Sequence, residues 1–340
     1  MSTQDDLQAT IQQMVQRGKG ILAADESLPT IEKRFAPIGV ASTPETRRAY
    51  RALLFTAPGI EDYLSGVIEF EETLEQTTDE GEALPAVLAR RGITPGVKVD
   101  KGKGPLSGAP GDLITCGLDG LATRLAHYRE RGARFAKWRE VYAISPTNPT
   151  SLGLRANAEM LARYAAVCQE LGVVPIVEPE VLMDGGHDID RCAEVTEQVL
   201  HSVFHALHLH HVTLEHMILK PNMVLPGKEC RRASPEEVAE ATIRVFRRVV
   251  PAAVPSINFL SGGQGPEEAT ANLNAINAGF PDEPWLLSFS YGRALQQPVL
   301  EAWRGEAANT AQAQRALLKR ARLNGLAQLG QYHPEMENED

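Results

Sequence analysis

The sequence predicts an α/β fold in which a single (β/α)8 TIM barrel carries extra helices at both ends. Short apolar runs recur along the 340 residues, and stretches with helical spacing separate them. Most of these runs end on a charged or glycine-bearing residue. Active sites of parallel barrels gather at the carboxyl ends of the strands, which is where these polar residues fall. An open doubly wound sheet is the structural alternative, because periodicity alone does not distinguish the two.

Eight apolar runs are predicted to be strands. In chain order they cover 19–25, 65–70, 95–101, 135–143, 174–181, 217–224, 256–262 and 285–293. Good helix formers with helical periodicity lie between them, most clearly at 155–171, 190–208 and 235–249. Segments 5–17 and 311–329 are predicted to be additional helices outside the repeat.

One domain covering 1–340 is predicted, because no repeat, low-complexity tract or long linker divides the chain. Residues 334–340 form an acidic tail with little apolar surface, so we expect disorder beyond about Pro334, while Tyr332 is expected to pack behind the last helix. No apolar run approaches the roughly 18 residues of a membrane span. The polar, acidic N-terminus does not have the pattern of a secretory signal, so we expect a cytoplasmic location and no membrane partner.

The formal net charge of −10 disfavours a nucleic-acid partner, since proteins that bind nucleic acids usually carry a basic face. It is compatible with small anionic substrates, because a cleft can gather positive charge locally on an acidic molecule. The four cysteines lie far apart without a C-x-x-C spacing, and we interpret them as reduced packing residues.

The histidines between 201 and 211 resemble a metal cluster at first sight. His201, His205 and His208 share one face of a predicted helix. No partnering carboxylate pattern accompanies them, and we favour surface or subunit-contact histidines over metal ligands. The motifs of P-loop NTPases, α/β-hydrolases and zinc proteases do not occur in the sequence either.

Lys220 lies in an apolar run, 216–224 (HMILKPNMV), where a charged ammonium would be costly to bury. Desolvation and a second cation, for which Lys137 is a candidate, lower the pKa of a lysine enough for its amine to attack a ketone. The alternative is an ordinary lysine whose stem is buried while its head reaches solvent, and for any single strand lysine that alternative is the more frequent one.

The grouping of charged residues favours the nucleophile. Eight of them fall near the predicted strand ends: Asp25, Lys98, Lys137, Arg139, Glu178, Glu180, Lys220 and Arg293. Glu178 and Glu180 are two residues apart and face the same side of a strand, so one carboxyl can be held protonated by the other for acid/base catalysis. A structural ion pair with the lysines is the alternative, above all for Glu180. Asp25 is a candidate base or partner of a substrate hydroxyl, although a helix N-cap is the more frequent role of such a residue.

Two glycine-bearing turns follow the seventh and eighth strands, where many barrels bind phosphate through backbone N–H groups. They are 261–264 (SGGQ) and 290–293 (SYGR), with Ser261, Gly262, Ser290, Gly292 and Arg293 as candidates. Glycine lets the backbone approach the ligand closely, and arginine adds a bidentate donor. Either turn alone is ordinary, but together they predict a phosphate site.

Several segments, in order, resemble class I fructose-1,6-bisphosphate aldolase over essentially the whole chain. They are 20–27 (GILAADES), 96–102 (GVKVDKG), 135–139 (FAKWR), 174–180 (VPIVEPE), 219–224 (LKPNMV), 259–264 (FLSGGQ) and 289–296 (FSYGRALQ). The resemblance implies a (β/α)8 barrel, usually a homotetramer, that reversibly splits fructose 1,6-bisphosphate into dihydroxyacetone phosphate and glyceraldehyde 3-phosphate. It also implies that no metal or other cofactor is needed, because a covalent imine is the electron sink.

The same resemblance implies roles for individual residues. Lys220 would form the imine, Glu178 would shuttle protons, Lys137 and Asp25 would orient the carbinolamine and the substrate hydroxyls, and Glu180 would support Lys137 and Lys220. Ser261, Gly262, Gly292 and Arg293 match the positions that hold the ketose C1 phosphate. Ser27, Lys33, Arg34, Lys98 and Arg139 match positions used around the other phosphate.

Two expectations go beyond this match. Members of the animal and plant type carry a longer tail that ends in tyrosine, whereas this sequence ends in 337–340 (ENED), and we expect this acidic tail not to replace that tyrosine. A related imine-forming aldolase acting on another ketose phosphate, such as fructose 1-phosphate, is the alternative enzyme. A phosphosugar-binding or scaffold protein that has lost the chemistry is the alternative outside catalysis.

Overall fold

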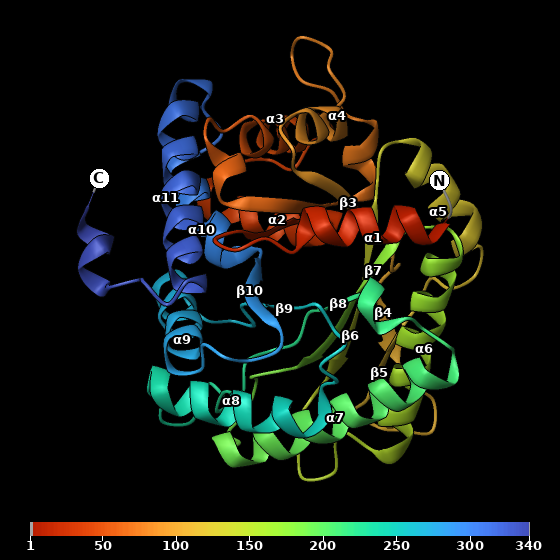
Figure 1. Ribbon diagram of the computed structural model, residues 1–340. Coiled ribbons are helices and arrows are strands. Elements are labelled where there is room, and N and C mark those ends of the chain that lie inside the picture. Colours follow the sequence, from red (N-terminus) through yellow and green to blue (C-terminus); the bar gives the residue numbers. More distant parts are fainter. Residues whose placement is uncertain (1–2, 340) are drawn as a thin grey trace.

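The computed structural model describes residues 3–339, and within them the strands form a closed parallel barrel (Figure 1). The barrel order is β1-β10-β9-β8-β7-β6-β3-β2, so strands that follow one another in the repeat are neighbours and β1 closes on β10. The eight strands are β1 (Gly20–Ala24), β2 (Leu64–Glu69), β3 (Thr94–Lys98), β6 (Phe135–Tyr142), β7 (Val174–Val181), β8 (Ile218–Leu219), β9 (Ser256–Phe259) and β10 (Leu286–Tyr291). Each falls within or overlaps one predicted run. The predicted barrel is confirmed, and the open sheet is excluded.

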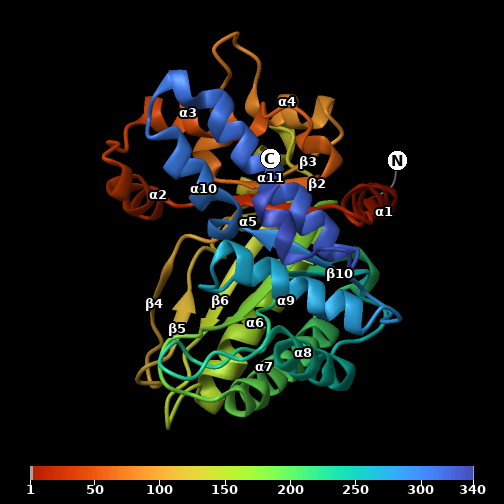
Figure 2. The same cartoon turned by 90° about the vertical axis from the view of Figure 1, so that its left-hand side faces the viewer.

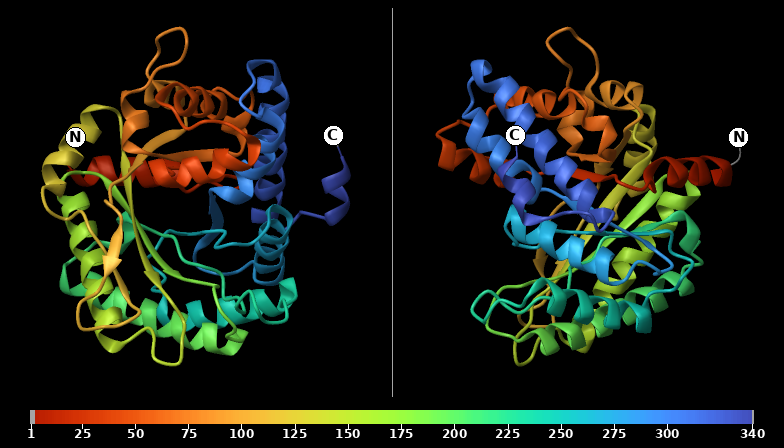
Figure 3. Two further views of the ribbon diagram at one scale, coloured as in Figure 1. Left: turned by 180° about the vertical axis from the view of Figure 1, so that it is seen from behind. Right: turned by 60° about the vertical axis from the view of Figure 1, so that its left-hand side comes forward.

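Helices surround the barrel and cover the outer faces of the strands (Figures 1 and 3). They are α1 (Thr3–Met14), α2 (Leu28–Phe35), α3 (Pro44–Phe55), α4 (Leu84–Arg90), α5 (Leu121–Glu130), α6 (Ser151–Glu170), α7 (Ile189–Leu209), α8 (Pro235–Val249), α9 (Pro266–Gly279), α10 (Arg293–Trp303) and α11 (Thr310–Gln328). Helix α8 shows how the sequence sets the boundaries. Ser234 and Glu237 form a capping box, proline follows the cap, and arginines occupy the last turn.

The lumen of the barrel is filled at its amino end. Side chains such as Ile21, Phe135 and Ile176 pack there in one buried cluster, and Leu7 and Ile11 of α1 join it. In the side view of Figure 2, α1 lies at one end of the barrel and the β4–β5 hairpin at the other. Since the amino end is plugged, open space remains only at the carboxyl ends of the strands.

One glycine is required by this packing. A Cβ atom placed on Gly96 of β3 would lie 2.3 Å from the ring of Phe135. The aromatic ring therefore fills the lumen only because the neighbouring strand has no side chain at that point.

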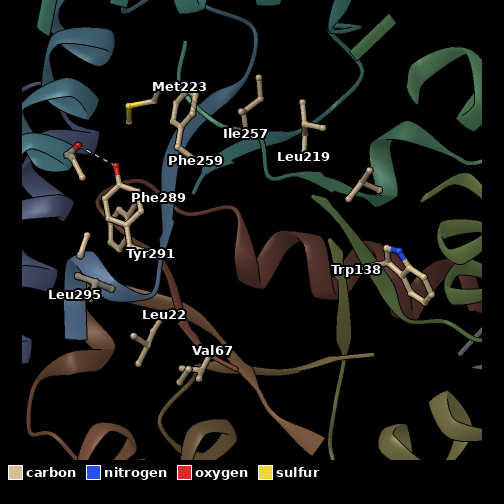
Figure 4. Close-up of a cluster of buried hydrophobic side chains, with 14 of the residues drawn as sticks. Leu22, Val67, Trp138, Leu219, Met223, Ile257, Phe259, Phe289, Tyr291 and Leu295 are labelled. Carbon is tan, nitrogen blue, oxygen red and sulfur yellow. Dashed lines mark hydrogen bonds between the residues drawn. The ribbon is translucent and has the colours of Figure 1, made fainter. Parts of the chain in front are cut away.

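A second, larger cluster lies between the strands and the helices. Figure 4 shows outward-facing residues of the strands in it, among them Leu22, Val67, Ile257 and Phe259. The hydroxyl of Tyr291, at the end of β10, donates a hydrogen bond of 3.0 Å to the carbonyl of Ala269 in α9. This layer fixes each strand against its helix and so fixes the strand ends that carry the polar residues.

The hairpin of β4 (Lys103–Pro105) and β5 (Leu113–Thr115) was not predicted. Its strands are three residues long and have no apolar alternation, so the sequence gives no strand signal there. The hairpin is attached to β6 through Thr115, which donates its backbone N–H to the Glu140 carboxylate at 3.1 Å and its hydroxyl to the carbonyl of Arg139 at 2.8 Å. Tertiary contacts therefore stabilise it.

The acidic tail differs from the expected disorder. Residues Pro334–Asn338 form a 3-10 helix on the outer flank of α11, and Asp340 lies outside the described residues (Figure 1). Glu337 pairs with the buried Arg320 at 2.6 Å and accepts a hydrogen bond of 3.0 Å from Tyr332. A buried arginine without a carboxylate partner is strongly destabilising, so the ion pair of Arg320 with Glu337 orders the tail although the tail has few apolar side chains. Tyr332 is buried, as expected.

Candidate active site

A cavity of about 810 Å³ opens at the carboxyl end of the barrel. Its lining comes from the ends of β1, β3, β6, β7 and β10 and from the loops beyond them. Nearly all the predicted site residues are among the lining residues: Asp25, Ser27, Arg34, Lys98, Lys137, Arg139, Glu178, Glu180, Lys220, Ser261, Gly262, Ser290, Gly292 and Arg293. Lys33 is the exception. It is exposed on α2 and does not line the cavity, because the helix turns its side chain away from the side that carries Arg34.

Two lysines share one carboxylate in the centre of the cavity. The amine of Lys220 lies 3.3 Å from Oε1 of Glu178, and the amine of Lys137 lies 3.1 Å from Oε2 of the same side chain. Lys137 is also 2.8 Å from Oδ2 of Asp25. The parallel register produces this grouping, since Arg139 of β6 faces Glu178 of β7 and the backbone N–H of Lys220 donates to the carbonyl of Val177.

Burial sets the protonation of Lys220, whose side chain is 4% exposed. Desolvation lowers its pKa below the ordinary value; the negative charge of Glu178 opposes this effect, and the positive charge of Lys137 adds to it. The pKa of Lys137 moves the other way. Burial would lower it, but Asp25 and Glu178 together outweigh burial and raise it. One lysine is therefore favoured as a neutral amine and the other as a permanent cation.

The two central carboxylates are ionised at neutral pH. Burial alone would raise the pKa of Asp25, but the charges of Lys137 and Lys220 outweigh it and lower the value to about 2. For Glu178 burial is again outweighed by nearby cations, and its pKa is lowered. The prediction that one of Glu178 and Glu180 is held protonated by the other is not supported for Glu178, because Lys137, Lys220 and Arg139 outweigh burial and the negative charge of Asp25.

Glu180 is paired with Arg139, from which it accepts a hydrogen bond. The predicted support of Lys137 and Lys220 by Glu180 is therefore not seen as a direct contact. Glu178 and Glu180 face the same side of β7, as expected. Glu180 lies two residues nearer the mouth of the cavity, where it pairs with Arg139, which lies two residues beyond Lys137 on β6. The inward-facing charges of β6 and β7 therefore form two layers: Lys137 with Glu178, and Arg139 with Glu180 nearer the mouth of the cavity.

Ser261, Gly262, Ser290, Gly292 and Arg293 come together at the ends of β9 and β10. Helix α10 begins at Arg293, and no side chain caps its N-terminus. The hydroxyl of Ser290 is buried and has no hydrogen-bond partner among the described residues. Free backbone donors, a free hydroxyl and an arginine at a helix N-terminus are what a phosphate group requires.

Arg34 belongs to the same end of the cavity. The pKa of Arg293 is lowered, first by burial and then by the positive charge of Arg34. Neither arginine has a carboxylate partner among the ion pairs of residues 3–339. Lys98, by contrast, is paired with Asp100 at 2.6 Å and lies on β3. The resemblance assigned Arg34 and Lys98 to the same phosphate, but Arg34 lies beside Arg293 and Lys98 is paired with Asp100.

Several further charged or polar residues that line the cavity were not predicted as site residues. They are Glu26, Lys101, Lys103, Thr115, Asp184 and Lys228. Lys103 and Thr115 belong to the unpredicted hairpin, and Lys228 pairs with Asp184 at 2.7 Å. Glu26 and Lys101 lie at or next to the ends of predicted strands but were not singled out, whereas no strand signal in the sequence marks the other four.

The histidines and cysteines form no metal site in the described part of the chain. No group of three or more metal-ligating side chains occurs within residues 3–339. His201, His205 and His208 are exposed on α7, as the sequence predicts. The four cysteines are free.

Comparison with known proteins decides the family. The family model for class-I fructose-bisphosphate aldolase matches residues 6–340. The chain is 55% identical to the cytoplasmic isozyme of fructose-bisphosphate aldolase from Spinacia oleracea over 328 residues, which are 96% of this chain and 92% of the relative. The chain belongs to this family. A probable class 1 fructose-bisphosphate aldolase from Xylella fastidiosa is 52% identical, over 96% of this chain and 98% of the relative.

Structural comparison agrees with the sequence relatives. A co-crystal structure of fructose-bisphosphate aldolase from Plasmodium falciparum, in complex with TRAP and a small-molecule inhibitor, matches with a TM-score of 0.95 at 49% identity. The match covers 97% of this chain and 96% of that one. The predicted activity is confirmed: the chain is a lyase of the aldolase family that reversibly cleaves fructose 1,6-bisphosphate. The non-catalytic alternative is thereby wrong. Within the part of the chain that the structure describes, no helix is long and apolar enough to span a membrane.

Proposed function

We propose that Lys220 is the nucleophile and forms an imine with the C2 ketone of the substrate. The observation that supports this assignment is the pair of buried lysines on either side of Glu178. Burial and the neighbouring cation favour the neutral form of Lys220, whereas Lys137 keeps its charge. An amine with a free electron pair next to a fixed cation is suited to attack a carbonyl and to stabilise the oxyanion that results.

Glu178 is proposed to move the protons. Attack of the Lys220 amine on C2 leaves a positive charge on nitrogen and a negative charge on oxygen, and Glu178 takes one proton from that nitrogen and passes it to the oxygen to give the neutral carbinolamine. One further proton, taken up from solvent and delivered through Glu178, lets the hydroxyl leave as water, so that a cationic imine remains. The ionised carboxylate then accepts the proton of the C4 hydroxyl while the C3–C4 bond breaks. The bonding pair enters the enamine, and glyceraldehyde 3-phosphate is released. Protonation at C3 and addition of water release dihydroxyacetone phosphate and restore Lys220.

Asp25 and Lys137 are proposed to orient the intermediate. Their ion pair of 2.8 Å fixes both groups beside Glu178. The lowered pKa of Asp25 makes it an acceptor for substrate hydroxyls throughout the neutral range. Glu180 acts one step away, by holding the guanidinium of Arg139 at the cavity wall.

The two phosphates are proposed to bind at opposite sides of the cavity. Ser261, Gly262, Ser290, Gly292 and Arg293, with Arg34, suit the C1 phosphate. Ser27, Lys98 and Arg139 suit the other phosphate, while Lys33 does not line the cavity and has no part in this proposal. Separate cationic ends fit a substrate that carries a phosphate at each end.

No metal or other cofactor is part of the proposed mechanism, because the imine is the electron sink. We also propose that the chain works in the cytoplasm, as the names of the plant relatives state for those proteins, and that it forms a homotetramer. The partners are then small sugar phosphates.

Borohydride reduction in the presence of dihydroxyacetone phosphate tests the nucleophile. The reagent converts the imine to a stable secondary amine, and peptide mapping identifies the modified residue. We expect the label on Lys220. A label on Lys137, or none at all, would refute the assignment.

A further inference from the structure

We propose that Arg51, Glu26 and Gln296 form a clamp behind the barrel wall that positions Asp25 for catalysis. This inference rests on the role proposed above for Asp25. It concerns residues that contribute nothing to substrate binding in that mechanism, and the three belong to elements far apart in the sequence.

The turn after β1 carries Asp25 and Glu26 in opposite directions. Strand residues Ile21 and Ala23 belong to the lumen cluster, whereas Leu22 and Ala24 belong to the outer core. Asp25 continues the inward set and meets Lys137, and Glu26 reaches Arg51 and Gln296 of the surrounding helices.

The chain is held on both sides of Asp25, at Ala23 and at Glu26. Oε2 of Glu26 lies 2.7 Å from the guanidinium of Arg51 on α3. The side-chain amide of Gln296 on α10 donates to Oε1 of Glu26 and to the carbonyl of Ala23, each at 2.7 Å. The backbone before Asp25 and the side chain after it are therefore fixed by one small network.

The same helix that supplies Gln296 also forms the phosphate end of the cavity. Helix α10 begins at Arg293, three residues before Gln296. The rings of Phe35, Tyr50 and Trp303 pack against one another in edge-on and tilted arrangements, with centroid distances of 5.1 to 5.7 Å, and so join α2, α3 and α10. Figure 2 shows these helices together on one side of the barrel. The clamp thus connects the position of Asp25 to the element that receives the phosphate.

The ionisation of this region favours Glu26 as the partner of Arg51, which is 3% exposed. Glu69, at the end of β2 and in register with Ala24, is fully buried, and neither of its carboxyl oxygens has a hydrogen-bond partner among the described residues. Burial raises the pKa of Glu69 well above its ordinary range, although Arg51 opposes the shift. This shift favours the neutral form of Glu69, and it is Glu26 that forms the ion pair with Arg51.

A buried ion pair is a poor device for stability alone, because apolar side chains of similar volume often stabilise a fold as well or better. A positional role accounts for its presence next to the cavity. If the turn shifts by about 1 Å, the loss of catalytic geometry is expected to reduce turnover by up to roughly a hundredfold.

Arg51→Met in the full chain tests the clamp, with Arg47→Met as a matched control. Arg47 lies one turn earlier on α3 and forms a comparable pair with Glu72 at 2.5 Å, but this pair does not touch the turn of Asp25. Turnover of fructose 1,6-bisphosphate is divided by the number of sites that borohydride traps with dihydroxyacetone phosphate, so that unfolded protein does not count.

For Arg51→Met we expect turnover per site to fall about 10- to 100-fold, with the KM changed less than about threefold. Arg51→Lys should recover part of the loss, and Arg47→Met should keep wild-type turnover. Wild-type turnover per site in Arg51→Met, or an equal loss in Arg47→Met, would overturn the proposal. If Arg51→Met does not fold, Gln296→Leu decides in its place, since it removes an uncharged donor from the same clamp and should lower turnover in the same way.

Asp25→Asn separates this inference from the proposal on which it rests. If Asp25→Asn keeps full turnover, the role of Asp25 and the clamp both fail. If Asp25→Asn is inactive while the clamp variants are fully active, only the clamp fails. A loss in Arg51→Met that adds little to the loss in Asp25→Asn, measured in the double variant, supports the coupling of the two residues.

Discussion

At the scale of single residues, the chemistry depends on which charges share a buried space. Lys137 and Lys220 are the same residue type within one cavity, yet their pKa values shift in opposite directions. Lys137 has two carboxylates close to it, whereas Lys220 has one, at a longer distance. The number and distance of counter-charges therefore decide that the pKa of Lys220 is lowered while that of Lys137 is raised.

Lys220→Arg should abolish cleavage while the protein stays folded. A guanidinium keeps the positive charge but is not a nucleophile at neutral pH. We expect turnover below about a thousandth of the wild-type value, since covalent catalysis is lost, and substrate analogues should still bind. Steady-state kinetics, with circular dichroism as the control for folding, check this result. Higher residual turnover would mean that another group is the nucleophile.

Arg293→Ala should weaken the binding of phosphorylated substrates by roughly 2 to 4 kcal/mol, the range for removal of a charge-assisted bidentate contact. Unphosphorylated dihydroxyacetone should lose far less. Trapping by borohydride at a series of concentrations measures both ligands with one assay. Equal losses would show that Arg293 maintains the fold or the imine geometry instead of binding the phosphate.

At the scale of elements, each of two short segments that the sequence does not predict as ordered has a carboxylate among the contacts that hold it. The β4–β5 hairpin is bonded to Glu140 of β6, and the tail is bonded to Arg320 of α11 through Glu337. Both contacts are buried or partly buried, so their strength depends on the surroundings as much as on the segment itself.

Glu140 should make the stability of the hairpin region depend on pH. Burial raises its pKa to about 7, although hydrogen bonds from Trp138 and Thr115 oppose the shift. The folded state then holds a proton that the unfolded state releases above about pH 4.5, so the free energy of unfolding should fall as the pH rises from about 4.5 to about 7. The shift corresponds to about 3 kcal/mol.

Urea unfolding at fixed protein concentration between pH 5 and pH 8 measures this loss. In Glu140→Gln the pH-dependent part should be smaller by one titrating group. Because Glu140 accepts hydrogen bonds at both oxygens, this variant should also be less stable at pH 5. An unchanged slope would contradict the raised pKa of Glu140.

Truncation after His333 should destabilise the protein and leave catalysis unchanged. It removes Glu337 and leaves the guanidinium of Arg320 buried without its carboxylate. Because Glu337 is partly exposed, we expect a loss of about 1 to 3 kcal/mol, less than for a fully buried pair. Thermal unfolding measures the loss, and cleavage of fructose 1,6-bisphosphate and fructose 1-phosphate is the control. A large fall in turnover, especially for the bisphosphate alone, would show that the tail reaches the active site.

At the scale of the whole molecule, a strongly acidic protein presents a cavity with two cationic ends. The formal net charge is −10, but lysines and arginines from several strands and loops converge on one opening, where basic lining residues outnumber acidic ones. The closed barrel makes this possible, because it brings the carboxyl ends of all its strands to one rim.

Activity should survive a strong chelator. Incubation with EDTA followed by gel filtration should leave at least about nine-tenths of the turnover, because the proposed imine does the work that a Lewis-acidic metal would otherwise do. A known metal-dependent aldolase treated in parallel is the positive control. Loss of turnover that added zinc restores would contradict the Schiff-base mechanism.

The sequence by itself determined the barrel and most of the predicted residues that line its cavity. Apolar runs with polar ends are local features, and the inward residues of a strand follow from its alternation, so Lys220, Glu178, Lys137 and Asp25 are predictable from the sequence alone. The two glycine-bearing turns that line the cavity are predictable for the same reason, since glycine at the end of a strand is visible in one segment.

Only the tertiary structure decided which charges pair. Glu180 meets Arg139 instead of the lysines, Arg34 lies beside Arg293, and Lys33 turns away from the cavity. The contact of Arg51 with Glu26 and that of Arg320 with Glu337 likewise join segments that no local pattern connects. The physical reason is that an ion pair depends on a distance of a few ångströms between side chains, and the packing of whole helices and strands sets that distance.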